Sequence, residues 1–142
     1  MTDVYVGRMG GLPTSLEQQD ALSRFLDGLP RVPVKAHLDP SSVEHGRALF
    51  HAHGCIGCHV NETGTLTFDR SIGKKDEQGN EMQTQVPMLL GVADRAPYMH
   101  DGCAATLTDR FTNVACAGST HGDTASLSAN DIADMVTFLE SL

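Results

Sequence analysis

Apolar side chains recur at helical spacing in several segments, separated by polar or proline-containing stretches. The first such pattern predicts a helix over about 15–28, which Pro30 ends. Ser15 and Gln18 have the form of a capping box at its start. The apolar positions of this segment are Leu16, Leu22, Phe25, Leu26 and Leu29.

The residues that follow, 31–35, read as an extended linker, because Pro30 and Pro33 hold the local backbone away from helical geometry. We therefore assign residues 1–35 to a helix and linker that end a preceding domain. Residues 36–142 then form a domain of their own.

Within this domain we expect a helix from about Asp39 to His53, because Asp39 suits the cap and Pro40 the first turn. A short helix is expected over 104–113. A last helix follows the cap at Ser128, with apolar side chains at i, i+3, i+4 and i+7. These side chains are Ile132, Met135, Val136 and Leu139.

Residues 60–85 are polar and punctuated by glycine, and only 66–68 show strand-like alternation. We interpret this stretch as a polar loop or small hairpin. The predicted fold class is all-α, with short helices around one core.

The chain has 142 residues and a net charge of −8 with histidine neutral. This length suits one core-forming domain, and the acidic surface disfavours nucleic acid and suits a basic or neutral protein partner. The sequence has no run of eighteen apolar residues, so membrane insertion is not expected. The first residues lack the basic and apolar regions of a signal peptide.

Cys55-Ile56-Gly57-Cys58-His59 is the C-x-x-C-H signature of covalent c-type haem attachment. The two thiols, Cys55 and Cys58, can add to the two vinyl groups of one porphyrin. His59 is then placed to become the proximal ligand of the iron. The sequence therefore predicts a redox protein with one covalent haem c.

Two other classes of site also use C-x-x-C. A thioredoxin-like site needs a strand before the motif, whereas residues 45–54 have a helical pattern. A zinc site usually needs two close ligand pairs, and Cys103 and Cys116 are thirteen residues apart. Both readings are weaker than haem attachment.

We expect Cys103 and Cys116 to form a disulfide, with two buried free thiols as the alternative. A disulfide and C-x-x-C-H maturation both fit an oxidising compartment outside the cytoplasm. We therefore expect a periplasmic or otherwise extracytoplasmic location, the chain being part of a longer exported protein.

The chain resembles the C-terminal haem domain of the bacterial di-haem cytochrome c peroxidases and MauG-like proteins, over roughly residues 39–142. The resemblance implies a cytochrome c-like fold around one haem. Four segments carry it: 46–50 with the haem motif, 86–92, Ala96-Pro97-Tyr98-Met99-His100-Asp101-Gly102 with Thr106-Leu107, and 127–139. Separately, the first and last predicted helices have similar patterns, from which we expect residues 1–30 to be the closing helix of a preceding cytochrome-like unit.

Departures from this family restrict what the resemblance implies. The family's peroxidase chemistry uses two haems, whereas this chain has a single C-x-x-C-H motif and no tryptophan for an aromatic relay between haems. Leu90 stands where the family often has arginine. The family's distal ligand would fall at Val114, which cannot bind iron.

Two residues are the main candidates for the sixth iron ligand. His121 lies just past the family's ligand position, and related domains with such an insertion carry a similar His-Gly. Met99 lies forty residues past His59, a separation typical of simple class I cytochromes. The remaining alternatives are a sixth position that is open or occupied by water and, less favoured, a sixth position filled by another side chain. Imidazole should give a lower potential than thioether.

The resemblance also implies that Pro97, Tyr98 and His100 lie against the haem, with His100 near a propionate or a backbone carbonyl. Arg47 and Arg95 are candidate propionate partners, because guanidinium pairs bidentately with carboxylate.

The predicted function is electron transfer by a mono-haem c-type cytochrome domain, to or from another redox protein or an adjacent redox domain. The alternative is a peroxidase-like enzyme with an open distal site, for which His100 or Glu62 would supply acid-base chemistry.

Overall fold

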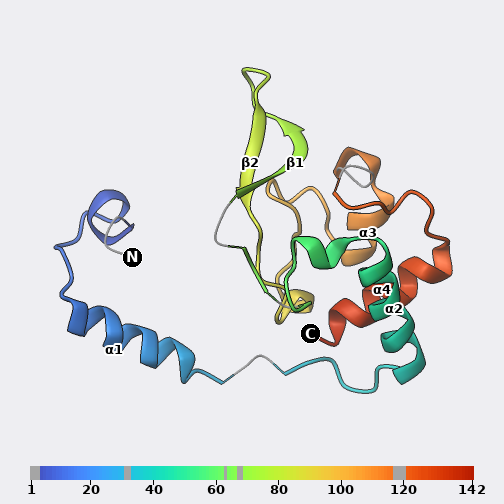
Figure 1. Ribbon diagram of the computed structural model, residues 1–142, viewed down its shortest axis with the longest axis horizontal. Coiled ribbons are helices and arrows are strands. Elements are labelled where there is room, and N and C mark those ends of the chain that lie inside the picture. Colours follow the sequence, from blue (N-terminus) through green and yellow to red (C-terminus); the bar gives the residue numbers. More distant parts are fainter. Residues whose placement is uncertain (1–3, 31–32, 63, 67–68, 117–120) are drawn as a thin grey trace. The chain divides into compact units, whose positions relative to one another are not determined.

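The computed structural model describes residues 4–30, 33–62, 64–66, 69–116 and 121–142 (Figure 1). The chain divides into two units, Met1–Val32 and Pro33–Leu142. The assignment of separate domains stays a prediction. In the described ranges, no helix is both long and apolar enough to cross a membrane.

The N-terminal unit contains a π-helical turn, Val4–Arg8, and helix α1, Leu16–Asp27. The predicted capping box is formed: Ser15 Oγ accepts from Gln18 N at 3.2 Å, and Gln18 Oε1 accepts from Ser15 N at 2.9 Å. No residue of α1 is buried. Its apolar stripe is therefore open to solvent, with Phe25 64% exposed.

In the C-terminal unit, helix α2 (Pro40–Ala52) packs against helix α4 (Ala129–Glu140). The contact depends on Gly46, where a Cβ atom would lie 2.1 Å from the Asp134 carbonyl oxygen and 2.7 Å from Phe138 Cβ. Any side chain at this position would push the two backbones apart. The predicted helices over 39–53 and from Ser128 are thus confirmed.

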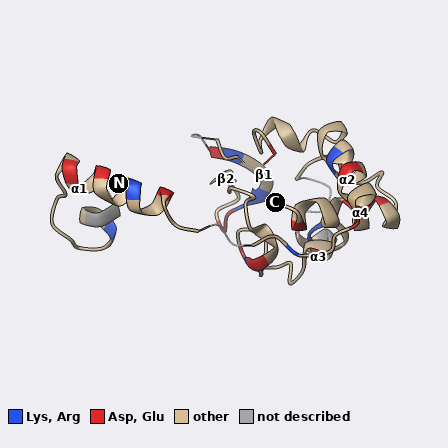
Figure 2. Ribbon diagram, turned by 90° about the horizontal axis from the view of Figure 1, so that it is seen from below, with Lys and Arg blue, Asp and Glu red and all other residues tan. Residues whose placement is uncertain are grey.

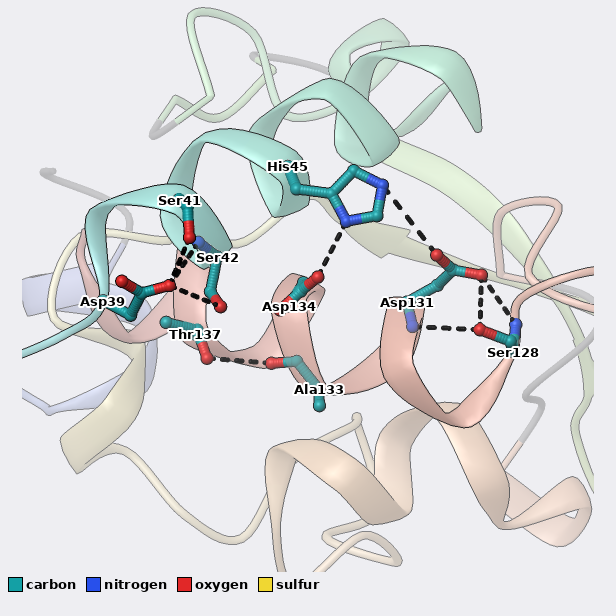
Figure 3. A network of polar contacts seen from close by, with 9 residues as sticks. All are labelled: Asp39, Ser41, Ser42, His45, Ser128, Asp131, Ala133, Asp134 and Thr137. Atoms are coloured by element: carbon teal, nitrogen blue, oxygen red, sulfur yellow. Dashed lines mark hydrogen bonds and ion pairs between the residues drawn. The ribbon is translucent and has the colours of Figure 1, made fainter.

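A polar network joins the same two helices (Figure 3). The 2.7 Å bond between His45 Nδ1 and Asp134 Oδ2 crosses from α2 to α4. A carboxylate only accepts, so the proton lies on Nδ1. Asp39 caps α2 by accepting from Ser42 N at 3.0 Å, and Ser128 forms a capping box with Asp131 at the start of α4. The two capping contacts fix where α2 and α4 begin, and the His45–Asp134 bond joins the two helices.

The hydrophobic core is built around the packed faces of α2 and α4. The rings of Phe50 and Phe138 meet edge to face with centroids 5.4 Å apart. Met135 and Phe138 are fully buried. Leu107, from the short helix that lies between α2 and α4 in the sequence, packs in the same cluster. The remaining members of the core cluster are Leu89, Val92 and Leu139.

A two-stranded antiparallel sheet corrects the predicted all-α class. Strand β1 (Asp69–Lys75) pairs with β2 (Glu81–Gln85), so the fold is mainly helical with one hairpin. Asp76 Oδ1 accepts from the backbone N–H groups of Gln78 and Asn80, at 2.9 and 2.8 Å, and this closes the turn. The strand-like alternation at 66–68 is not part of either strand, and residues 67–68 lie outside the described residues.

Helix α3 (Leu107–Thr112) is shorter than the predicted helix over 104–113. Ala104 instead pairs with Tyr98 in an isolated β-bridge, and Thr106 and Asp109 form the capping box. The predicted disulfide between Cys103 and Cys116 is confirmed. It links the residues on either side of α3.

Replacing both Cys103 and Cys116 by serine is expected to lower the free energy of unfolding by about 3 kcal/mol, because the reduced chain regains loop entropy. Denaturant unfolding of the matured protein measures this loss. A reductant should destabilise the wild type more than the double variant. Equal stability of the two proteins would contradict a stabilising role.

Candidate haem site

A cavity of about 480 Å³ lies within the C-terminal unit and is lined by the haem-attachment motif. Its volume falls in the usual range for cofactor and ligand pockets. Most of the walls are apolar. The apolar lining includes Phe50, Val86, Leu89, Val92, Leu107, Phe111, Met135 and Leu139.

The attachment motif begins where α2 ends. Gly54 adopts a φ of +74°, in the left-handed region that favours glycine, and turns the chain into the short 3-10 helix Cys55–Gly57. His59 N donates to the Cys55 carbonyl at 2.9 Å, which keeps the motif wound. Cys55 and Cys58 are free thiols, and His59 is 7% exposed. All three residues line the cavity.

The imidazole rings of His59 and His121 face the same cavity, with centroids 6.2 Å apart and planes inclined by 33°. A bond of about 2 Å on each side of one metal ion, with about 1 Å more from each nitrogen to its ring centre, gives a separation of about 6 Å. The observed distance matches this value. The Nδ1 atom of His121 is buried without a hydrogen-bond partner in the described part of the chain.

Burial favours the neutral form of both imidazoles. It lowers the pKa of His121 to about 4, and the charges of Arg110 and His59 add to this shift. Burial also lowers the pKa of His59, and a hydrogen bond with the Pro87 backbone opposes this shift by raising the pKa. A neutral imidazole has a free lone pair for a metal.

Two contacts hold the segment that carries His121. The Arg110 guanidinium donates through Nη2 to the His121 carbonyl. On the other side, His53 Nδ1 contacts the Asp123 carbonyl at 2.5 Å. A Cβ atom on Gly122 would lie 3.8 Å from Cys55 Sγ, so this segment passes beside the first thiol.

The Pro-Tyr-x-His-Asp-Gly block also borders the cavity, where Pro97, Tyr98, Met99 and His100 are among the lining residues. The Tyr98 hydroxyl donates to the Ala93 carbonyl at 3.0 Å, so it is engaged outside the cavity. His100 is exposed. Met99 has a φ of +70° and is half-buried.

Arg47 lies elsewhere. Its guanidinium pairs with Glu62 and sits over the Phe138 ring at 5.1 Å, and neither Arg47 nor Glu62 lines the cavity. Glu62 also contacts His51 at 2.9 Å, and both partners lower the pKa of its carboxyl group. Arg95 does line the cavity and donates to the Met88 carbonyl.

These observations fit a covalent haem. The cavity is apolar, two free thiols and an imidazole come from one motif, and a second neutral imidazole lies across from the first. Cys55, Cys58, His59 and His121 are the residues that would hold such a group. Because Cys103 and Cys116 are joined to each other, they are not ligands of a zinc ion.

The sequence analysis missed Arg110. It follows Leu107 by three residues and precedes Phe111, so it occupies the inner face of α3 together with two apolar side chains. A cation on an otherwise apolar helix face is the signal that marks it. Phe50 was also missed; its ring lies 6.2 Å from that of His59 and supports it from α2.

The C-terminal unit is thus mainly helical, with a small hairpin and a cavity lined mostly by apolar side chains. A solved structure of Kuenenia stuttgartiensis hydrazine synthase, pressurised with 20 bar of xenon, has a similar fold, with a TM-score of 0.67 and 17% sequence identity. The likeness covers 99% of this chain and 60% of that chain, and at this identity it concerns the fold alone. No protein-family model and no curated protein matches the sequence. Membership of the di-haem peroxidase family stays a prediction.

Proposed function

We propose that the C-terminal unit is a mono-haem c-type cytochrome domain that transfers single electrons. The observation that carries this proposal is the pair of buried neutral imidazoles, His59 and His121, facing one cavity beside two free thiols. A haem iron bound there would alternate between the ferric and ferrous states and so carry one electron.

In this proposal Cys55 and Cys58 would attach the porphyrin covalently, and His59 and His121 would supply the iron ligands. His121 is favoured over Met99 because its ring has the separation from His59 that two ligands of one ion require. Two imidazoles favour a lower potential than an imidazole with a thioether. The mostly apolar wall suits the apolar faces of a porphyrin.

The peroxidase-like alternative needs an open site, and the side of the cavity facing His59 is taken by the His121 ring. Of its two acid-base candidates, Glu62 is engaged by Arg47 and His51 outside the cavity lining, and His100 is exposed. The geometry therefore favours electron transfer.

The charge distribution bears on the partner. Helix α4 carries the acidic side chains Asp131, Asp134 and Glu140, whereas β1 carries Arg70, Lys74 and Lys75 (Figure 2). We propose that a redox partner with a basic or neutral docking face, or an adjacent redox domain, approaches α4. We also propose an extracytoplasmic location, which fits the disulfide.

The test is expression with a haem-attachment system, followed by mass spectrometry and spectroscopy of the purified protein. We expect a mass increased by one haem, low-spin absorption bands in both redox states, and a near-infrared magnetic circular dichroism band typical of two imidazole ligands. A colourless protein with the mass of its polypeptide would refute the proposal. A band typical of methionine ligation would show that His121 is not the sixth iron ligand.

A further inference from the structure

Arg110 places a positive charge at the wall of the haem site. Its side chain comes from α3, lines the cavity and stacks over the Phe111 ring, with the guanidinium carbon 4.9 Å from the ring centroid. Nη2 donates to the His121 carbonyl. Nη1 is buried and has no hydrogen-bond partner among the described residues.

This charge lacks an acidic counterpart in the described structure. The ion pairs found there involve other cations. Burial lowers the pKa of Arg110, and the Cys55 thiol opposes this shift. A thiol that has become a thioether no longer ionises. After haem attachment, therefore, nothing at Cys55 would neutralise the guanidinium.

Arg110 is held next to the attachment motif. Through the His121 carbonyl, Arg110 is tied to the segment that passes beside Cys55 Sγ. A group attached to Cys55 would therefore lie near this guanidinium.

We propose that Arg110 is a positioning residue that holds the His121 backbone and, through its uncompensated charge, raises the reduction potential of the site. Reduction removes one positive charge from the iron, so a fixed cation nearby in a poorly solvated site favours the reduced state. The inference rests on the proposed function, since it requires haem at this site.

The experiment compares the potentials of the matured wild type, Arg110→Gln and Arg110→Lys. We expect Arg110→Gln to lower the equilibrium constant for reduction about tenfold, equivalent to 59 mV for one electron. Arg110→Lys retains the charge and should stay within about threefold of the wild type. Lys35→Gln removes an equal charge from a side chain that is 53% exposed, and should change the constant less than twofold.

A wild-type potential in Arg110→Gln, or equal losses in Arg110→Gln and Arg110→Lys, would overturn the electrostatic role. If Arg110→Gln does not fold, nitrogen-15 NMR of the wild type still tests the placement. We expect resolved, slowly exchanging Nη protons for Arg110, and averaged signals would overturn it. A wild type without haem would instead refute the proposed function.

Discussion

Replacing His121 by alanine is expected to convert the ferric protein from low spin to high spin. The variant removes one of the two buried imidazoles whose centroids lie 6.2 Å apart, while the attachment motif stays intact. The iron would then lose its sixth strong ligand, or accept water in its place. Absorption and electron paramagnetic resonance spectra of the ferric variant measure the change.

The matched control is Met99→Leu, which alters the other candidate ligand in the same cavity while preserving its apolar character. This variant should keep the low-spin spectrum and the wild-type potential. The opposite pattern, high spin in Met99→Leu and low spin in His121→Ala, would assign the ligand to Met99. His121→Met should raise the potential, because a thioether favours ferrous iron.

Replacing Gly46 by alanine is expected to destabilise the C-terminal unit by about 3 kcal/mol or more. The new Cβ would lie 2.1 Å from the Asp134 carbonyl oxygen, and backbone atoms of α4 have little freedom to move away. Alanine favours an isolated helix by about 1 kcal/mol over glycine, which is too little to offset the clash. Denaturant unfolding of the matured protein measures the loss.

Gly7→Ala is the control for this prediction. Gly7 lies in the N-terminal unit, and nothing comes within 4 Å of a Cβ atom placed there. The stability and haem content of this variant should equal those of the wild type. Wild-type stability in Gly46→Ala would show that α2 and α4 can separate freely, contrary to the close packing described above.

The Gly46→Ala substitution should also disturb the geometry of the haem site. Phe50, one turn after Gly46 on α2, packs on Phe138 and lies beside the His59 ring. A shift of α2 away from α4 would therefore move the support of the proximal imidazole. We expect broadened ferric spectra in this variant, in addition to lower stability.

Features encoded in short stretches of chain could be predicted from the sequence. The capping signals at Ser15, Asp39 and Ser128 set three helix starts to within about one residue of those observed, because the bonds that make them span only three residues. The pairing of Cys103 with Cys116 also followed, since no other cysteines remained outside the attachment motif. The hairpin was a weaker prediction, because β1 and β2 are mostly polar and exposed.

The sequence by itself thus determined three helix starts, the two cysteines available for a disulfide and the residues able to attach a haem, because each depends on residue types at fixed short spacings. Only the tertiary structure decided which candidate ligand faces His59, because the sequence around His121 and Met99 does not say which side chain lies across the cavity. It also revealed Arg110, whose role depends on a carbonyl eleven residues away and on the burial that removes water from its charge.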